Sequence, residues 1–309
     1  MANLKDIKNR ILSVESTKKI TGAMKMVAAA KVKRAENLVK TSRPYTKELV
    51  AMFQKLLNSV NEFSSETLKI KLAIDDYPRL LAKRDVKTVG MLVMTSNKGL
   101  AGAYNANVVR ETLKRISAYK EQGISVQLFV AGQKGISALR KKCQQLDCPI
   151  VKKYYSSMDN PSPMEAREIA EDMAEFYVEE KIDKIEIVTT RFKNMMSYFV
   201  EDWQVLPVDG VIDPHDRISD SVLEPLMDFV PDRHHILQKI VPMYMTNIFY
   251  QALLEAQASE LASRMTAMSA ATTNADKMIH DLSIEYNKTR QAAITQEIIE
   301  VVSGAGAQG

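Results

Sequence analysis

Residues Ile248–Ser303 read IFYQALLEAQASELASRMTAMSAATTNADKMIHDLSIEYNKTRQAAITQEIIEVVS, without proline or glycine. Taken in alternating steps of four and three residues, this run places an apolar or small side chain at nearly every position of one stripe. Such spacing is typical of a helix that lays one face along a partner helix. At 1.5 Å per residue the helix would be roughly 80 Å long, so part of it should project from a domain of ordinary size. The stripe consists of Leu254, Ala258, Leu261, Met265, Met268, Thr272, Ala275, Ile279, Leu282, Tyr286, Thr289 and Ala293.

The beginning of the chain offers the partner for this helix. Residues 1–58 read as a second long helix with one apolar face and one basic face, and Pro44 should kink it or mark a junction. Because the two stripes lie at opposite ends of the chain, their pairing makes the helices antiparallel and everything between them an insertion. The apolar face carries Ile7, Ile11, Val14, Thr21, Met24, Ala28, Val32, Ala35 and Val39, and the basic face carries Lys5, Lys8, Arg10, Lys18, Lys19, Lys25, Lys31, Lys33 and Arg34.

Between the two helices the periodicity of the sequence changes. Short β-branched and apolar runs alternate with amphipathic stretches, which predicts a mostly parallel sheet with helices on its faces. Ser162, Pro163 and Glu165 are typical of a helix start, with Ser162 as the N-cap residue. A hairpin around Lys193–Asn194 would add an antiparallel edge strand. The expected strands are Thr88–Thr95, Ser125–Ala131, Ile150–Tyr155, Ile185–Arg191 and Ser197–Leu206, and the expected helices are Asn105–Gln122, Gly135–Lys142 and Pro163–Lys181.

These patterns predict an α/β protein, in which a long antiparallel coiled coil of N- and C-terminal helices carries an inserted Rossmann-like α/β domain. Residues 59–86 read as a short helix and a loop, residues 207–224 read as a loop, and Leu226–Val230 favours one more strand. Gly304 should stop the last helix. The expected division is residues 1–58 for the first coiled-coil helix, 59–230 for the α/β domain and 231–309 for the second coiled-coil helix.

Composition narrows the class of protein. The chain is 46% hydrophobic and 26% charged, which is typical of a soluble folded protein. It contains no apolar run of about 18 residues that could span a membrane, and the charged start MANLKDIKNR lacks the apolar segment of a signal peptide. Cys143 and Cys148 fit a reducing compartment, either as two unpaired thiols near a helix end or as a redox switch. The four histidines lack metal-ligand spacing, so we expect no metal site.

The loop Ser96–Asn105 is the one place where a phosphate could be held. Lys98, Gly99 and Gly102 lie between a strand and a helix, where phosphate loops occur. The loop nevertheless matches neither of the two common glycine-rich phosphate motifs. A tight turn that needs glycine for backbone room is therefore favoured. Neither a catalytic triad nor a carboxylate pair stands out, which favours a mechanical role.

The two ends of the chain resemble the gamma subunit of F-type ATP synthases. The C-terminal segment ITQEIIEVVSGAGA (Ile294–Ala307) matches the signature of that family, and IKNRILSVESTKKITGAMKMVAAAK (Ile7–Lys31) resembles the family as closely. ALLEAQASELASRMTAM (Ala252–Met268) and YNKTRQAAITQE (Tyr286–Glu297) are similar too, whereas the middle is similar only through TSNKGLAGAYNANV (Thr95–Val108). The signature positions are Ile294, Thr295, Glu297, Glu300, Gly304 and Ala305.

The resemblance implies a rotor. In the family, the coiled coil lies inside a ring of alternating alpha and beta subunits, and the α/β domain docks on the epsilon subunit and on the c-ring. Proton flow turns the c-ring and gamma, and the asymmetric shaft drives ATP synthesis at the beta subunits. The resemblance thus implies a subunit that binds no nucleotide and catalyses nothing by itself, and we expect no cofactor, metal or nucleic acid to bind it. It also implies a peripheral place on the cytoplasmic face of a bacterial cell membrane.

Two contacts with the beta subunits are implied in the same way. Arg290 and Gln291 resemble the family's contact with a beta-subunit loop, and Met24, Lys25 and Arg264 resemble a second contact that faces acidic beta-subunit segments. Arginine suits such a contact because it stays charged and can bind a carboxylate through two hydrogen bonds.

Two other classes of protein remain open from the residues alone. One is a coiled-coil scaffold with an α/β recognition domain, and the other is a nucleotide-binding enzyme that uses the loop at Lys98. A scaffold would not need charged residues such as Arg290 and Glu297 in its apolar run, and an enzyme should offer a catalytic pair.

Overall fold

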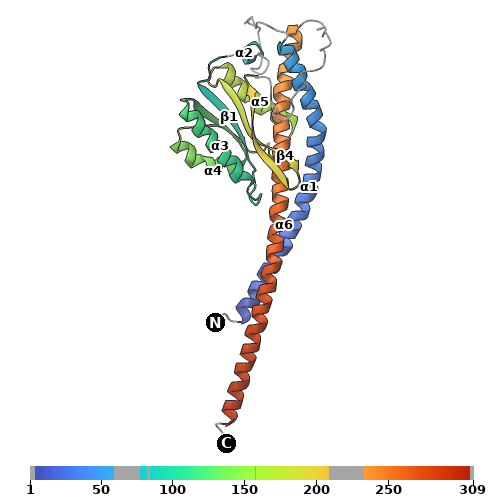
Figure 1. Ribbon diagram of the computed structural model, residues 1–309, viewed down its shortest axis with the longest axis vertical. Helices are drawn as coiled ribbons and strands as arrows, with labels where there is room; N and C mark the ends of the chain where they lie inside the picture. Colours follow the sequence, from blue (N-terminus) through green and yellow to red (C-terminus); the bar gives the residue numbers. More distant parts are fainter. Residues whose placement is uncertain (1–3, 59–76, 82–83, 157, 209–232, 307–309) are drawn as a thin grey trace. The chain divides into compact units, whose positions relative to one another are not determined.

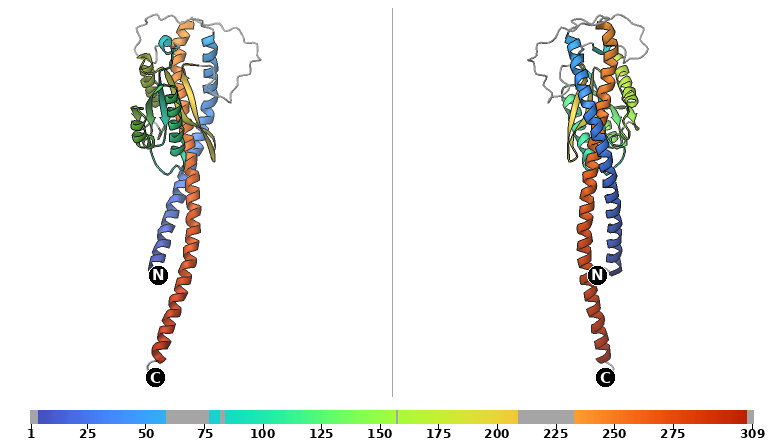
Figure 2. Two further views of the ribbon diagram at one scale, coloured as in Figure 1. Left: turned by 60° about the vertical axis from the view of Figure 1, so that its left-hand side comes forward. Right: turned by 90° about the vertical axis from the view of Figure 1, so that its right-hand side faces the viewer.

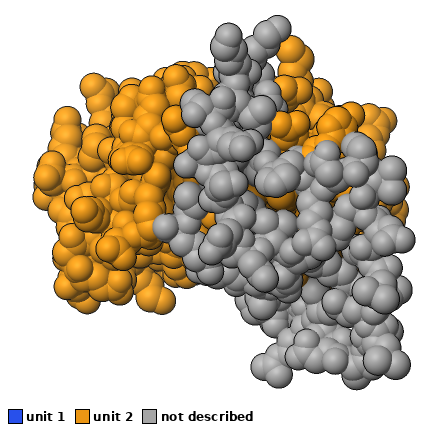
Figure 3. All heavy atoms as spheres, turned by 90° about the horizontal axis from the view of Figure 1, so that it is seen from above, with its two compact units in different colours: residues 1–30, 264–309 blue, residues 31–263 orange. Residues whose placement is uncertain are grey.

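The computed structural model describes residues 4–58, 77–81, 84–156, 158–208 and 233–306 of the 309-residue chain (Figure 1). The chain divides into two compact units. The first unit comprises residues 1–30 and 264–309, and the second unit comprises residues 31–263. Figure 3 shows the second unit in orange, seen from above. The strand expected at Leu226–Val230 and most of the segment 59–86 lie outside the described residues.

Two long helices are formed by the two ends of the chain, as expected. Helix α1 (Leu4–Asn58) continues through Pro44, and helix α6 (Arg233–Gly306) continues through Pro242. Helix α6 ends at Gly306 and not at Gly304, so the expected stop was placed too early. A single glycine raises the cost of a helical residue by only about 1 kcal/mol, which a helix end can tolerate.

Burial follows the two stripes that the sequence predicts. Every residue of both stripes is buried or half-buried. In the first unit, Ile7, Ala28, Met268, Ala275 and Leu282 are buried among exposed neighbours. Both views of Figure 2 show the N-terminal part of α1 beside α6 in that unit. The spacing of apolar residues therefore identified the faces along which the helices pair.

Polar contacts between the two long helices show that these helices run antiparallel. In the first unit, the Oγ1 atoms of Thr21 and Thr272 lie 2.9 Å apart, and Lys18 Nζ lies 2.5 Å from Asp276 Oδ1. A later position in α1 thus meets an earlier position in α6. The ion pair is about half exposed on both sides, so it contributes little stability. The buried apolar stripe holds this pair of helices together.

The second unit contains a five-stranded sheet with the strand order β3-β2-β1-β4-β5. β1 to β4 are parallel, and β5 pairs antiparallel with β4 at one edge. This is the mostly parallel sheet with an antiparallel edge that the sequence predicts. The strands are β1 (Thr88–Met94), β2 (Ser125–Ala131), β3 (Ile150–Tyr154), β4 (Lys184–Asn194) and β5 (Ser197–Leu206).

Different helices cover the two faces of this sheet (Figure 1). On one face, α3 and α4 pack over a core that includes Met91 and Leu128. On the other face, α5 and parts of α1 and α6 share one core with residues such as Leu92 and Phe129. The long helices thus form part of one layer of the α/β domain. The shorter helices are α2 (Tyr77–Leu81), α3 (Tyr104–Glu121), α4 (Gln133–Gln145) and α5 (Pro163–Val178).

The two ends of helix α5 can be compared with the helix start and helix end that the sequence predicts. The Ser162 side chain accepts a hydrogen bond from the backbone N–H of Glu165, so the expected helix start is confirmed. Helix α5 ends at Val178 and not at Lys181, because Glu180 has a left-handed φ of 59° that a helix cannot continue through.

The hairpin turn lies beyond Asn194, two residues later than expected. Strand β4 continues to Asn194, since Phe192 is buried and belongs to the packed part of the strand. The Asn194 Oδ1 atom then accepts hydrogen bonds from the backbone N–H groups of Met196 and Ser197, which is the way asparagine stabilises a turn.

Gly132→Ala should destabilise the second unit. Gly132 has a φ of 98°, and a Cβ atom there would lie 2.0 Å from the carbonyl oxygen of Thr95. Strain and clash together should lower the free energy of unfolding by about 2 kcal/mol or more. Thermal denaturation followed by circular dichroism measures the loss. Gly99→Ala is the control, because its new Cβ would approach no closer than 3.6 Å to a lysine side-chain carbon; equal melting temperatures for both variants would contradict this prediction.

Native Cys143 should resist alkylation. Both cysteines are free and buried, and burial raises the pKa of the Cys143 thiol to about 12. Since the thiolate is the reactive form, its fraction at pH 8 should be lowered by about a thousandfold. Iodoacetamide should therefore label the folded chain far more slowly than the chain in guanidinium chloride. Rapid labelling of the peptide containing Cys143 in the folded state, measured by mass spectrometry, would refute the prediction.

Candidate functional site

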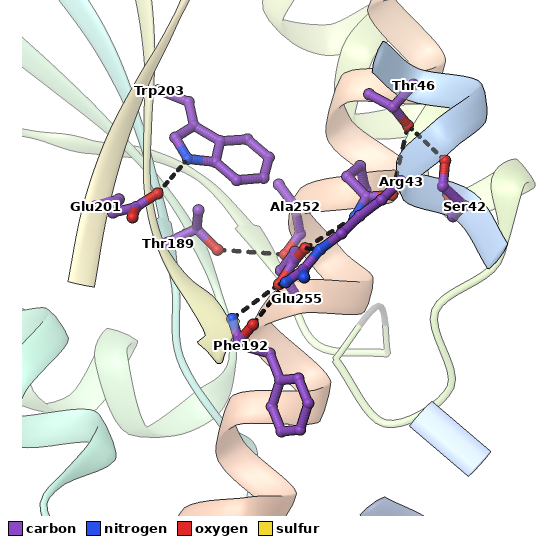
Figure 4. Close-up of polar contacts among 10 residues, drawn as sticks. Ser42, Arg43, Thr46, Thr189, Phe192, Glu201, Trp203, Ala252 and Glu255 are labelled. Carbon is purple, nitrogen blue, oxygen red and sulfur yellow. Dashed lines mark hydrogen bonds and ion pairs between the residues drawn. The ribbon is translucent and has the colours of Figure 1, made fainter. Parts of the chain in front are cut away.

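An ion pair between a buried carboxylate and a partly exposed arginine joins three elements of the second unit (Figure 4). Glu255 on α6 is 2% exposed and accepts two hydrogen bonds from Arg43 on α1, with Nε to Oε1 at 2.6 Å and Nη2 to Oε2 at 2.8 Å. This bidentate geometry is the strongest form of a carboxylate–arginine contact. The same two side chains also bind the backbone of Phe192 on β4. We call Arg43, Thr46, Phe192, Gln251 and Glu255 the polar joint.

Both backbone polar groups of Phe192 form hydrogen bonds with side chains of the long helices. Its N–H donates to Glu255 Oε2 at 2.8 Å, and its carbonyl oxygen accepts from Arg43 Nη2 at 2.6 Å. Its aromatic side chain packs into an apolar cluster formed by both long helices. The end of β4 is thereby attached to α1 and α6 at one point. The apolar cluster comprises Val32, Ala35 and Val39 of α1, Leu254, Ala258 and Ala262 of α6, and Phe192.

The Glu255 carboxylate has partners for both of its oxygens. Oε1 receives the Arg43 Nε–H and, at 3.0 Å, the side-chain amide of Gln251. Gln251 lies one helical turn before Glu255 and accepts a long hydrogen bond of 3.4 Å from the Thr46 hydroxyl. A buried charge is tolerated when its hydrogen-bonding capacity is used in this way. Because Gln251 and Glu255 are four residues apart, they lie on the same face of α6, where their side-chain oxygens accept hydrogen bonds from Thr46 and Arg43 of α1.

Further hydrogen bonds bind α6 to the sheet domain on either side of the joint. The Thr189 hydroxyl of β4 donates to the carbonyl oxygen of Ala252 at 3.2 Å. The Ser263 hydroxyl donates to the carbonyl oxygen of Ala101 at 2.7 Å. The sequence does not predict these contacts or those of the polar joint, because the type of a polar residue does not reveal which distant backbone group its side chain will meet.

The residues expected to contact beta subunits all lie in the first unit. Arg290 and Gln291 are adjacent and exposed on α6, Met24 is half-buried, Lys25 is exposed on α1, and Arg264 is half-buried on α6. The exposure of Arg290 agrees with a side chain that leaves the seam between the helices. The contacts themselves stay predictions.

The signature residues lie on the last described turns of α6. Thr295 donates from its hydroxyl to the carbonyl oxygen of Gln291 at 2.9 Å, and Glu297 and Glu300 are exposed; Gly304 and Ala305 are helical. Apolar side chains here are exposed on several sides of the helix, unlike those of the stripe. These exposed residues are Ile294, Ile298, Ile299, Val301 and Val302.

The loop Ser96–Asn105 is held by its own polar groups. The backbone N–H of Ser96 donates to Asn105 Oδ1 at 2.9 Å, and the Ser96 hydroxyl donates to the carbonyl oxygen of Lys98 at 2.7 Å. Gly102 has a positive φ of 54°, whereas Gly99 does not, so only one of the two glycines meets the expectation of a turn that requires glycine. Next to it Ala103 has an ordinary φ of −86°. The geometry favours a turn over a phosphate site.

Other kinds of site find no support among the described residues. A shallow hollow lies between α3 and β5, away from the loop of Lys98, and is lined by Asn107, Arg110, Glu111 and residues 196–200. The described ranges bring together no group of three His, Cys, Asp or Glu side chains suited to a metal ion. No helix within those ranges combines the length and apolar character needed to cross a bilayer.

Comparison with known proteins assigns the family. The family model described as ATP synthase matches residues 3–307. The ATP synthase gamma chain of Gloeothece citriformis (strain PCC 7424) is 39% identical over 328 aligned positions, covering 99% of this chain and 100% of the relative. The gamma chain of Synechococcus sp. (strain JA-3-3Ab) is 38% identical with the same coverage.

Solved structures agree with this relationship. A chain from the central stalk and c-ring of the Tetrahymena thermophila mitochondrial ATP synthase is 26% identical, with a TM-score of 0.58 over 82% of this chain and 99% of that one. A chain from the Euglena gracilis mitochondrial ATP synthase is 18% identical and shares the fold, with a TM-score of 0.66 over 99% of this chain and 94% of that one. The family model and the two gamma-chain relatives, which match almost the whole chain, show that the chain belongs to the ATP synthase gamma-chain family.

Proposed function

We propose that this chain is the central-stalk rotor subunit of an F-type ATP synthase, which couples proton-driven rotation of a c-ring to ATP synthesis at beta subunits. The observation that carries the proposal is the pairing of two long antiparallel helices from the chain ends, one of which continues into a segment of exposed apolar side chains. Relatives named as gamma chains match over almost the whole chain. The subunit would also regulate ATPase activity and proton flow, but would itself catalyse no reaction.

The proposed partners follow from the family. Alternating alpha and beta subunits would surround the coiled coil, and the epsilon subunit and c-ring would bind the α/β domain. Support comes from the Tetrahymena structure, which contains a central stalk together with its c-ring. The chain would be peripheral to the membrane, on the cytoplasmic face of a bacterial cell membrane, and would take part in hydrogen-ion transport only through the complex.

The division of roles along the chain is also a proposal. Residues 1–58 and 231–309 would form the shaft, and residues 59–230 would form the foot domain. The boundaries separate roles and differ from those of the two compact units, because the long helices contribute residues to both units.

Arg290 and Gln291 would carry the first contact with a beta subunit, and Met24, Lys25 and Arg264 the second. Exposure of Arg290, Gln291 and Lys25 supports this role, since these side chains are available to a surrounding ring. An Arg290 hydrogen bond to a beta-subunit carboxylate would form in one rotary position and break in the next. It would thus bias the order of rotary states more than it fixes assembly.

Arg290→Ala should assemble normally and turn over slowly. Loss of one partly buried charged hydrogen bond costs on the order of 1.5–3 kcal/mol, which is about 10- to 150-fold in rate if it falls on the limiting step. Arg290→Lys should not restore the rate, because lysine lacks the planar fork that binds a carboxylate.

The measurement for Arg290 is ATPase activity and ATP-driven proton pumping in membranes that carry each variant. Lys277→Ala, which removes another exposed cation from α6, is the control and should behave as the wild type. Wild-type turnover of Arg290→Ala would remove Arg290 from the mechanism, and its failure to assemble would assign it a structural role.

Lys98→Ala should leave ATP synthesis close to the wild-type rate. The loop uses the backbone carbonyl of Lys98, and its side chain is exposed. By contrast, Ser96→Ala removes a hydroxyl that bonds both Lys98 and Asn105 and should lower the free energy of unfolding by about 1 kcal/mol. Synthesis rates in membranes and thermal melts of the purified chain test the pair. Abolished synthesis in a normally assembled Lys98→Ala complex would instead favour a nucleotide site at this loop.

A further inference from the structure

A rotor that passes torque needs directional contacts between its parts. If this chain turns as proposed above, the sheet domain and the helices α1 and α6 have to turn together. Apolar packing is non-directional, so it holds surfaces together without opposing every small slip between them. Charge-assisted hydrogen bonds with bidentate geometry fix both distance and orientation. Mechanical coupling between parts of the rotor is therefore expected at charge-assisted, bidentate hydrogen bonds.

The polar joint meets this requirement within the second unit. The four hydrogen bonds among Arg43, Glu255 and the Phe192 backbone are all between 2.6 and 2.8 Å. They come from three elements that are distant in sequence: α1, β4 and α6. Figure 4 shows the Arg43 and Glu255 side chains meeting beside the end of β4. Displacement of any one element along another would lengthen at least two of these bonds.

The position of the joint adds to its effect. The side chain of Phe192 inserts among small residues of both helices, including Ala35, Ala258 and Ala262. Small residues let the backbones of α1 and α6 approach one another. The Phe192 ring and the Arg43–Glu255 pair therefore contact both helices where these lie close together. The joint thus sets the register of α1 against α6 and of both helices against the β4–β5 hairpin.

Stability alone does not account for such a pair. The Glu255 carboxylate is almost fully buried, whereas the Arg43 side chain is 34% exposed. Taking a carboxylate out of water is costly, and buried ion pairs are often replaced by apolar residues with little loss of stability. What apolar residues cannot reproduce is the set of fixed directions at Phe192. This difference separates a positioning role from a purely stabilising one.

We propose that Arg43 and Glu255 are positioning residues that couple the α/β domain to the helix pair, so that twisting force passes between them without slip. The inference rests on the proposed rotor function. It predicts that weakening the joint lets the sheet domain fluctuate and slip against the helices under load, while the proposed beta-subunit contacts of α6 still support ATP hydrolysis.

The test uses two variants of the complete complex. Glu255→Gln keeps the size of the side chain but removes the charge that Arg43 requires. The double variant Arg43→Met/Glu255→Gln removes both charges and keeps an oxygen that can accept the Phe192 N–H. Glu171→Gln is the matched control, because Glu171 binds Arg167 Nε at 2.7 Å in an exposed pair on α5.

Two readouts separate positioning from stability. The first is the ratio of ATP-driven proton pumping to ATP hydrolysis per assembled complex, measured as the opposing gradient grows. The second is the angular fluctuation of a bead attached to an added cysteine, Lys153→Cys, in stalled single complexes. We expect both joint variants to show a severalfold lower ratio near the limiting gradient and broader fluctuations, and the control to match the wild type.

Each outcome decides the matter. Wild-type ratios and fluctuations in both joint variants would overturn the inference, as would failure of both variants to assemble, since the pair would then serve folding. Loss of pumping and hydrolysis in equal proportion would mean reduced stability without a coupling role. If the wild-type chain itself neither assembled with alpha and beta subunits nor rotated, the proposed function would fail, independently of the joint.

Discussion

The carboxylate of Glu255 is the point at which three distant segments of the second unit are joined. It is buried, bound by Arg43 from α1 and by the backbone N–H of Phe192 from β4. A buried charge without these partners would cost several kcal/mol. The arrangement of α1, α6 and the hairpin around it is therefore constrained to one geometry, because any other would leave the charge or the Phe192 amide without a partner.

Helix α6 has two different environments along its length, and this explains its pattern of side chains. Residues 251–260 are buried on almost every side, because α6 is there part of one layer over the sheet and also a partner of α1. Beyond Arg264, in the first unit, burial contracts to a single stripe, and the last turns are exposed on several sides. A helix that is buried on all sides is apolar all round, whereas a helix that is buried on one side carries a single apolar stripe. The part of α6 in the second unit is of the first kind, and the part in the first unit is of the second kind.

Much of the architecture could be predicted from the sequence because local periodicity carries it. The stripes at Leu254–Ala293 and Ile7–Val39, the sheet strands and the cap at Ser162 were all found from spacing and residue type. The errors lie at ends: the hairpin turn beyond Asn194, the end of α5 at Val178 and the end of α6 at Gly306. The end of a helix or strand depends on the backbone angles of one residue or on the burial of one side chain. The periodicity of a long stretch of sequence predicts neither of these.

By itself the sequence determined that two helices from the chain ends pair antiparallel around an inserted α/β domain, because hydrophobic spacing and chain connectivity leave few other ways to bury the stripes. The predicted stripe contains Thr289 and not Arg290, and in the structure Thr289 is half-buried while Arg290 is exposed. Only the tertiary structure decided which residues meet across the fold. The joint of Arg43, Glu255 and Phe192 brings together residues from α1, α6 and β4. Contacts of this kind depend on the three-dimensional path of the chain, and no repeating pattern in the sequence encodes them.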